Sequence, residues 1–432
     1  MKYFSLSNNS YQVSFKEALF TGLAPDGGLY FPSKVKPLKK SFLNNLKNLS
    51  KSEIAYHVIS QFVGDEIDKK HLIEIIDHSI NFDFPLKQLN ENISVLELFH
   101  GPTMAFKDVG ARFTSRCISH LNKLEKKVTV LVATSGDTGA AVASGFHGVD
   151  GIDVFILYPK DKISKIQEKQ ISTYSGNIFP VKVEGTFDDC QKMVKAALVD
   201  NELVKKFNFT SANSINISRW IPQMLYYFFA YMQTEKQKDD ISFSIPSGNY
   251  GNLFSCLLSR KLGLPIKHII SANNINNPVE KYILTGEYKP QPSKRTLSNA
   301  MDVGSPSNFV RVKELFESNL DRIRKVMYGY SFSDSETSEA IKELIDKYEY
   351  TCDPHGAIGY LGAKKHLINN PQSQIIFLET AHHSKFHEET KSFINQEFEM
   401  PIQLKNIIGK ESNSVGVNDF NEFREYVKLT AS

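Results

Sequence analysis

The chain contains 432 residues, of which 41% are hydrophobic and 23% are charged, a composition typical of globular proteins with a sizeable buried core. The 51 Lys and Arg residues nearly balance the 48 Asp and Glu residues, so the net charge of +3 excludes the broad basic surface of a nucleic-acid-binding protein. The longest apolar run, residues 224–232, is about half as long as a membrane span, which argues against a transmembrane helix.

Residues 1–95 are predicted to form a separate module at the front of the chain. A short strand is expected near residues 3–7, and helical patterns follow at 15–22, 53–63 and 70–80. The module contains no cluster of titratable side chains. We therefore expect it to pack over the rest of the chain rather than to carry chemistry.

From residue 95 onward, predicted strands alternate with predicted helices. Strands are expected at 95–99, 128–134, 154–158, 178–184, 241–245, 266–272 and 375–379, and helices at 139–147, 164–174, 186–199, 218–233, 253–262, 309–316, 336–348 and 356–366. Because parallel strands need helical crossovers, this alternation predicts an α/β fold whose largely parallel sheet is covered on both faces. Residues 288–308 are rich in Pro, Ser and Asn and are predicted to form a long, mobile loop.

The four cysteines are far apart in the sequence and form no CxxC motif. This usage favours free thiols in a reducing setting over a disulfide framework. The first ten residues lack a long apolar core, so we expect no signal peptide. The expectation is a soluble, cytoplasmic protein that binds neither membrane nor nucleic acid.

Lys107 stands at the corner between the predicted strand 95–99 and an amphipathic helix. A helix N-terminus disfavours a cation, and the preceding Met104, Ala105 and Phe106 shield the side chain from water. Both effects lower the pKa of the ammonium, and a neutral lysine is the nucleophile that a Schiff base with a carbonyl cofactor such as pyridoxal 5′-phosphate requires. The alternative is a surface lysine whose stem covers Phe106, and this segment alone favours that alternative.

Two other strand-to-helix corners are rich in Gly and in hydroxyl or amide side chains, and ligands of doubly wound sheets collect at such corners. Residues 246–252 (Pro-Ser-Gly-Asn-Tyr-Gly-Asn) offer successive N–H groups that suit a phosphate; the alternative is a tight structural turn. Residues 133–139 (Ala-Thr-Ser-Gly-Asp-Thr-Gly) offer hydroxyls and N–H groups to a carboxylate or a second phosphate. The alternative there is helix capping by Ser135 or Asp137.

Two further stretches carry polar groups. Residues 210–219 end in Arg219, whose guanidinium suits bidentate binding of an oxyanion; the alternative is pairing with a neighbouring carboxylate. After the strand 375–379, His383 and His387 have a spacing that a metal could use on a helix face. No third ligand is evident, so no metal site is predicted.

Together these segments resemble the threonine synthase family in its longer bacterial and fungal form. This is a group of pyridoxal-phosphate enzymes with the tryptophan-synthase-β-like fold (fold type II). The resemblance spans nearly the whole chain and rests on residues 24–29, 98–108, 134–141, 213–219, 246–252, 297–302 and 379–382 occurring in this order. It implies two doubly wound α/β subdomains behind an N-terminal module at residues 1–95. The catalytic region is then 96–432, with a smaller subdomain at about residues 130–210 inserted in the larger one.

The resemblance also implies how the cofactor is held. Lys107 would be the catalytic and Schiff-base lysine, and Phe106 would line the cofactor pocket. The cofactor phosphate would lie on Gly248, Asn249, Tyr250, Gly251 and Asn252. Thr380 would face the pyridine nitrogen, and Asp137 stands where shorter relatives place an Asn near the phenolic oxygen. His383 stands where the family is expected to have Pro.

The implied substrate is O-phosphohomoserine. Its carboxylate and phosphate would be bound by Ser135, Thr138, Asn213, Ser214 and Arg219. The implied carbon–oxygen lyase reaction converts O-phospho-L-homoserine and water to L-threonine and phosphate: Lys107 would move protons at Cα and Cβ, phosphate would leave from Cγ, and water would add at Cβ.

Two alternatives stay open. A phospho-lyase that takes the same substrate to 2-oxobutyrate would carry the same motifs. A binding protein that keeps the fold without its chemistry is the other alternative, because a fold does not fix a function. Members that resemble this long form are often monomers, so we expect a monomer.

Overall fold

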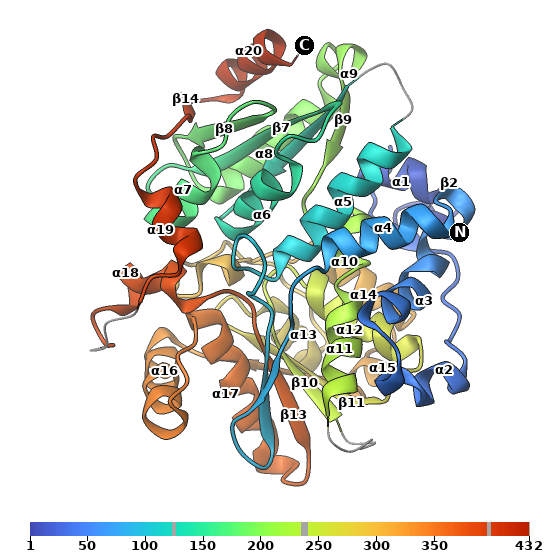
Figure 1. The fold of residues 1–432 in the computed structure, drawn as a ribbon, viewed down its shortest axis with the longest axis vertical. Coiled ribbons are helices and arrows are strands. Elements are labelled where there is room, and N and C mark those ends of the chain that lie inside the picture. The colour runs from blue at the N-terminus through green and yellow to red at the C-terminus, as the bar shows by residue number, and fades with distance from the viewer. Residues whose placement is uncertain (123–126, 235–240, 395–398, 432) are drawn as a thin grey trace.

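The computed structural model describes residues 1–122, 127–234, 241–394 and 399–431 and is built around a six-stranded sheet (Figure 1). Its strands, in spatial order, are β12 (Met327–Ser331), β11 (Ile266–Asn273), β10 (Ile241–Pro246), β13 (Gln374–Glu379), β5 (Ile93–Glu97) and β4 (Leu86–Gln88). All neighbours pair in parallel except β4, which is antiparallel to β5.

Helices cover both faces of this sheet. Ile375 and Phe377 of β13 belong to the core cluster of α16 (Asp334–Tyr348) and α17 (Pro354–Asn369). The alternate residues Ile376 and Leu378 belong to the cluster of α11 (Met224–Gln233) and α12 (Gly251–Lys261). Since side chains alternate between the two faces of a strand, β13 is buried on both sides, as expected for a central parallel strand.

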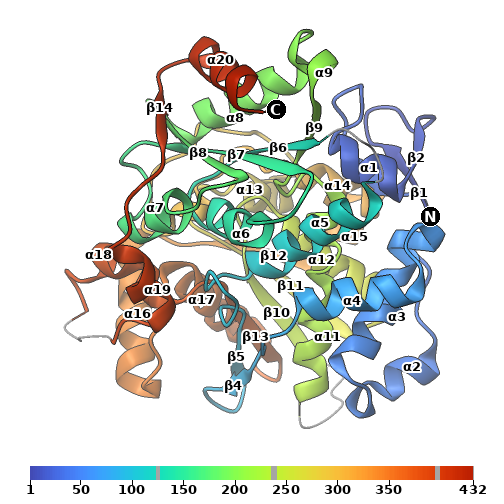
Figure 2. The same ribbon diagram turned by 45° about the horizontal axis from the view of Figure 1, so that its top comes forward.

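A second, five-stranded parallel sheet lies beside the first, above it in the tilted view of Figure 2. Its strands, in spatial order, are β14 (Val415–Val417), β8 (Ile178–Val183), β7 (Ile152–Pro159), β6 (Val128–Ala133) and β9 (Asn208–Ser211). Its helices are α5 (Lys107–Leu121), α6 (Asp137–Phe146), α7 (Lys165–Ser172), α8 (Phe187–Val199) and α20 (Phe420–Thr430). Val130 of β6 packs in the cluster of α5 and α6, and Leu131 in that of α8 and α20.

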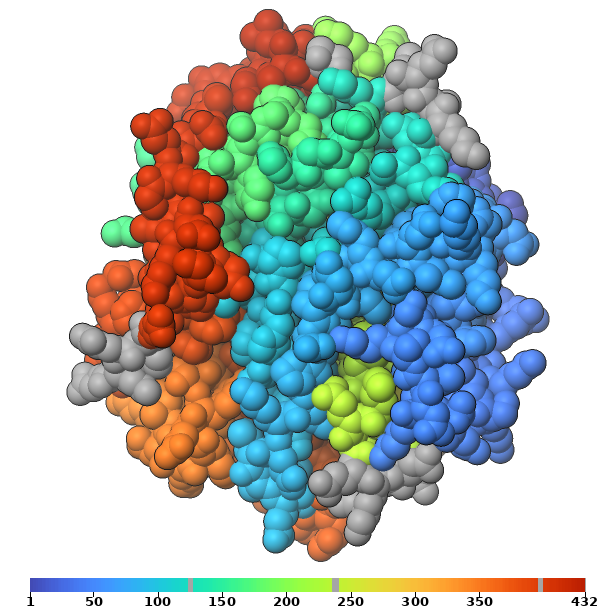
Figure 3. Space-filling view, in the orientation of Figure 1, coloured from blue at the N-terminus to red at the C-terminus, as the bar shows by residue number. Residues whose placement is uncertain are grey.

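The N-terminal residues pack against elements of both large sheets. They form a small antiparallel sheet and four helices: β2 (Gln12–Ser14), β1 (Lys2–Ser5), β3 (Tyr30–Pro32), α1 (Phe15–Thr21), α2 (Lys40–Asn44), α3 (Lys51–Val63) and α4 (Lys69–Ser79). Helix α3 contacts α11, α4 contacts α5 and α1 contacts β9. Figure 3 shows the blue N-terminal residues leaving only part of the yellow-green segment in view. This packing agrees with the expectation for the module, whereas the boundary at residue 95 and the inserted subdomain at 130–210 stay predictions.

The remaining helices are α9 (Leu203–Lys206), α10 (Ile217–Trp220), α13 (Pro278–Thr285), α14 (Phe309–Leu315), α15 (Leu320–Arg324), α18 (His387–Thr390) and α19 (Ile402–Ile408).

The single helix predicted at 218–233 is wrong: α10 ends at Trp220 and α11 begins at Met224. Pro222 lies between them, and a proline has no N–H to donate to the helical hydrogen-bond ladder. Strands β2, β3, β4, β9, β12 and β14 were not predicted, because each is at most five residues long and lacks a clear apolar alternation.

None of the helices in the described ranges combines the length and apolarity needed to cross a bilayer. The four cysteines are all buried and form no disulfide.

Candidate active site

The carboxyl ends of four strands border one cavity of ≈ 260 Å³. Lys107 follows β5, residues 247–250 follow β10, Thr380 follows β13, and residues 134–136 follow β6. The cavity lining includes every site residue predicted from the sequence: Phe106, Lys107, Ser135, Asp137, Thr138, Asn213, Ser214, Arg219, Gly248, Asn249, Tyr250, Gly251, Asn252 and Thr380. Segments far apart in the chain thus meet at one place, where ligands of doubly wound sheets bind.

Backbone contacts between two strand ends fix the position of Lys107. The Phe106 N–H donates to the Thr380 carbonyl at 2.8 Å, and Ala105 forms an isolated antiparallel bridge with Ala381. Met104 has a φ of +56°, a left-handed conformation that non-glycine residues rarely adopt, which turns the chain into α5. Lys107 is the first residue of α5, as the sequence predicted.

The burial of Lys107 favours a neutral amine. Burial lowers the pKa of Lys107 below the usual value of a lysine; Asp137 opposes this effect, and the positive charges of Lys385 and Arg219 add to it. Its Nζ makes neither a hydrogen bond nor an ion pair with another described residue. The Phe106 ring lies beside it, with its centroid 5.4 Å from Nζ. The arrangement leaves an amine that can act as a nucleophile or a base.

The loop after β10 presents a row of backbone donors. Within the described chain, the N–H groups of residues 248–252 have no protein acceptor. Tyr250 adopts a φ of +63° immediately before α12. Such a row at a helix N-terminus is a concave anion site. A Cβ at Gly248 would lie 2.9 Å from both the Ala300 carbonyl oxygen and the Met301 Cα, so only glycine fits here.

The side chains of this loop have structural partners. The Tyr250 hydroxyl bonds to Ser271 and Asn273, each at 2.6 Å, away from the loop backbone. Asn249 donates to the Ser214 hydroxyl at 2.8 Å, and Asn252 accepts from Tyr227 at 2.8 Å. The Asn252 Nδ2 is buried without a partner in the protein and is a donor available to a bound group.

The loop after β6 differs from the capping alternative that the sequence left open. Neither Ser135 nor Asp137 caps α6; the Thr134 hydroxyl accepts from the N–H groups of Gly136 at 2.9 Å and Gly139 at 2.8 Å. Ser135 and Thr138 line the cavity, and their hydroxyls have no hydrogen bond to the described protein. Both are therefore available to a ligand.

The segment before α10 carries Arg219, which is 3% exposed. Its Nη1 donates to the Ala212 carbonyl, and its Nε is buried without a protein partner. No carboxylate within the described ranges pairs with it, so the ion-pair alternative is wrong. Asn213 is less available than predicted, because its amide bonds to the backbone of Ala133 at 2.7 Å and 3.2 Å. The Asn213 side chain thus connects the segment before α10 to the loop after β6.

The sequence did not single out several groups of this site. His355 lines the cavity; its Nδ1 bonds to Asp353 at 2.5 Å and its Nε2 accepts from the Ala300 N–H at 3.3 Å. Residues of the 288–308 segment, including the short helix η3 (Asn299–Met301), and residues of α8 also line the cavity. The sequence contains one signal near these groups: Asp353 precedes Pro354 and caps α17. A helix cap does not by itself indicate a ligand site.

His383 and His387 belong to no group of three or more potential metal ligands among the described residues. The group that exists, Asp68, His71 and His120, lies outside the cavity. Asp68 caps α4 through the His71 N–H, which accounts for its position.

Comparisons with known proteins agree with this site. Residues 80–380 match the family "Pyridoxal-phosphate dependent enzyme", residues 2–80 match "Threonine synthase N terminus", and residues 356–427 match "Threonine synthase, C-terminal". A threonine synthase of Buchnera aphidicola subsp. Acyrthosiphon pisum is 40% identical over 420 residues, 97% of each chain. The crystal structure of threonine synthase from Escherichia coli has a TM-score of 0.94 and 38% identity, covering 99% of this chain and 100% of that one.

Another crystal structure, a PLP-bound threonine synthase from Brucella melitensis, has a TM-score of 0.91 and 31% identity and covers 100% of this chain and 99% of that one. The fold and the site together define a pyridoxal-phosphate-dependent enzyme of the tryptophan-synthase-β-like class. The donor set fits the cofactor, because the cavity holds an unpaired lysine, five N–H groups without acceptors for a phosphate, and the hydroxyl of Thr380. The chain belongs to the threonine synthase family.

Proposed function

We propose that this protein converts O-phospho-L-homoserine and water to L-threonine and phosphate in threonine biosynthesis, with the fourteen cavity residues in the roles given above. One observation carries the assignment: an unpaired lysine, an acceptor-free row of N–H groups and a separate set of polar donors line the same cavity. A reaction that holds a cofactor phosphate and a substrate phosphate at once needs two such anion sites.

In this proposal, pyridoxal 5′-phosphate, when bound, supplies an electron sink for the carbanions that form next to the substrate's amino group. Lys107 holds and then moves protons at Cα and Cβ, a role that suits an amine whose pKa burial lowers. The N–H groups of residues 248–252 would bind the cofactor phosphate, Phe106 would line one wall of its pocket, and the Thr380 hydroxyl would face the ring nitrogen. A neutral hydroxyl at this nitrogen does not force its protonation.

The second anion site orients the substrate. The free hydroxyls of Ser135 and Thr138 and the unpartnered Nε of Arg219 offer donors to its carboxylate and phosphate. The Ser214 hydroxyl accepts from Asn249 at 2.8 Å and so connects this site to residues 248–252. As phosphate leaves from Cγ, charge grows on its oxygens, so donors fixed in place stabilise the departing group.

We further propose a monomer in the reducing cytoplasm. The resemblance to the long form of the family supports the monomer, and the four buried cysteines, which form no disulfide, support the reducing setting. The division into a module at 1–95 and a catalytic region at 96–432 belongs to the same proposal. Light scattering during size-exclusion chromatography tests the monomer, for which the expected mass is 48.9 kDa.

Incubation of the purified protein with O-phosphohomoserine, with threonine, phosphate and 2-oxobutyrate resolved by chromatography, tests the reaction. Threonine and phosphate in equal amounts are expected, and a product dominated by 2-oxobutyrate contradicts the proposal. Borohydride reduction followed by peptide mass spectrometry tests the lysine, with a cofactor adduct expected on Lys107. Lys385→Arg is the control, because its adduct must stay on Lys107.

A further inference from the structure

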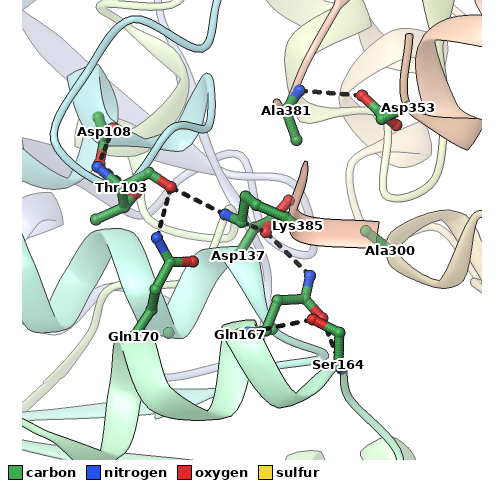
Figure 4. A network of polar contacts seen from close by, with 12 residues as sticks. Thr103, Asp108, Asp137, Ser164, Gln167, Gln170, Ala300, Asp353, Ala381 and Lys385 are labelled. Carbon is green, nitrogen blue, oxygen red and sulfur yellow. Dashed lines mark hydrogen bonds and ion pairs between the residues drawn. The ribbon is translucent and has the colours of Figure 1, made fainter. Parts of the chain in front are cut away.

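A second lysine is buried beside the cavity. Lys385 lies in the short helix η4 (His383–Phe386) after β13, and its side chain is fully buried. Its Nζ lies 2.7 Å from the Asp137 Oδ1 and donates to the Thr103 carbonyl at 3.0 Å, as Figure 4 shows. A buried ammonium is costly unless paired, so this contact is a fixed part of the site. Lys385 thereby links the larger sheet to the first residue of α6.

Two donors contact the same oxygen, Oδ1, of the Asp137 carboxylate. The Gln167 Nε2 also donates to Oδ1, at 3.0 Å, and Gln167 is itself fixed by the Ser164 N–H at 3.1 Å (Figure 4). Gly136 makes this contact possible, since a Cβ there would lie 2.5 Å from the Gln167 Nε2. Both donors take Oδ1, whereas Oδ2 has no hydrogen-bond partner among the described residues, and Asp137 lines the cavity.

Asp137 and Lys385 act on Lys107 in opposite directions. Asp137 favours the charged amine, whereas Lys385 and Arg219 disfavour it, and Asp353 adds a further attraction. Burial alone would raise the pKa of Asp137, but the charges of Lys385 and Lys107 outweigh burial and lower it. Without Lys385, the Lys107 ammonium would be the main charge left to neutralise the buried carboxylate.

We propose that Lys385 is a positioning residue that neutralises Asp137 and holds it through Oδ1, so that Asp137 faces the cavity through Oδ2 without retaining a proton on Lys107. This inference deepens the proposed function, because it assigns a role in keeping Lys107 reactive. The inference predicts a change in the titration of the Lys107 amine, so it can be wrong even if the protein makes threonine. It can also be right if the protein does not make threonine, because the reactivity of the amine is measured without turnover.

Competitive acetylation of the full-length, cofactor-free protein tests it. Acetic anhydride is applied between pH 6.5 and 10, and labelling of Lys107 is followed by peptide mass spectrometry. In Lys385→Met, the titration midpoint of Lys107 should rise by roughly one unit, which lowers labelling at pH 8 about tenfold. Lys385→Arg keeps the charge and should stay within about twofold of wild type. Unchanged or faster labelling in Lys385→Met overturns the proposal.

Lys182→Met is the matched control, because Lys182 pairs with Glu168 of α7 at 2.6 Å and does not line the cavity. Its removal should leave Lys107 labelling unchanged. A purely structural role of Lys385 predicts a lower melting temperature with no change in the Lys107 titration. If Lys385→Met does not fold, the neutral pair Asp137→Asn with Lys385→Met replaces it. The proposal expects that pair to label within about threefold of wild type, and tenfold slower labelling overturns it.

Discussion

At the scale of single residues, two positions that line the cavity are in close contact with backbone atoms, which cannot shift without moving a whole segment. Gly248 is one such residue, because the Ala300 carbonyl and the Met301 Cα lie where its side chain would be. Arg219 is another, because α10 approaches α5 closely: a Cβ at Gly110 would lie 2.7 Å from the Arg219 carbonyl oxygen. Both positions lead to predictions that separate the cofactor site from the substrate site.

Gly248→Ala should weaken cofactor binding by about tenfold or more, because the methyl group forces η3 and the N–H row apart, at a cost of roughly 1–3 kcal/mol. Fluorescence titration of the cofactor-free protein with pyridoxal 5′-phosphate measures the affinity. Gly409→Ala is the control, since nothing lies within 4 Å of its Cβ position and its φ is −80°. Undiminished cofactor affinity in Gly248→Ala would contradict the assignment of this loop.

Arg219→Lys should raise the KM for O-phosphohomoserine about tenfold, because an ammonium cannot make the two parallel hydrogen bonds of a guanidinium. Cofactor affinity should stay unchanged, since the proposed phosphate site at residues 248–252 is a separate set of donors. Steady-state kinetics and the same fluorescence titration give both values. Arg260→Lys serves for comparison, because Arg260 bonds to the Ile266 carbonyl at 2.9 Å outside the cavity. Loss of cofactor in Arg219→Lys would show that the two oxyanion sites are exchanged.

At the scale of elements, the Asp302 carboxylate ties residues 296–302 of the segment 288–308 to the end of β11. Asp302 accepts from the Thr296 N–H at 3.0 Å, the Thr296 hydroxyl at 2.7 Å, Asn274 at 2.9 Å and Asn276 at 3.2 Å. The Gln291 N–H also donates to the Gly304 carbonyl at 3.0 Å, and η3 lies against Gly248. Composition alone predicted an irregular loop here, and the bonds show what gives it a defined course.

Asp302 should make stability depend on pH. Burial raises the pKa of Asp302 to about 6, despite the hydrogen bonds that lower it. The folded protein thus keeps a proton that the unfolded chain releases near pH 4, so the stabilisation is complete below about pH 4 and is lost as the pH rises through 6. Between pH 4.5 and 7.5, wild type should lose about 2 kcal/mol relative to Asp302→Asn. Urea unfolding measures this difference, and parallel curves would refute the prediction.

At the scale of the whole molecule, the cavity takes residues from both large sheets. Lys107 and residues 248–252 lie at the end of the six-stranded sheet, whereas Ser135 and Thr138 lie at the end of the five-stranded sheet. A ligand that contacts both sets stabilises the folded protein as a unit.

Removal of pyridoxal 5′-phosphate should therefore lower the melting temperature. Adding it back at one hundred times its Kd should restore about 2.7 kcal/mol of stability. Pyridoxal, which lacks the phosphate, should restore much less at the same concentration, because the N–H row of residues 248–252 has nothing to bind. Differential scanning calorimetry makes the comparison, and equal stabilisation by the two compounds would exclude this loop as the phosphate site.

The sequence by itself determined the strand and helix alternation, the lysine at the start of α5 and the glycine-rich corners, because local periodicity and turn chemistry encode these features. It did not reveal the break at Pro222 or the short strands, for which local signals are weak. Only the tertiary structure showed that Asn213 bonds to Ala133 and that Lys385 pairs with Asp137 from 248 residues away in the chain. Such partners depend on which strand ends become neighbours, and that choice is made by packing of the whole chain.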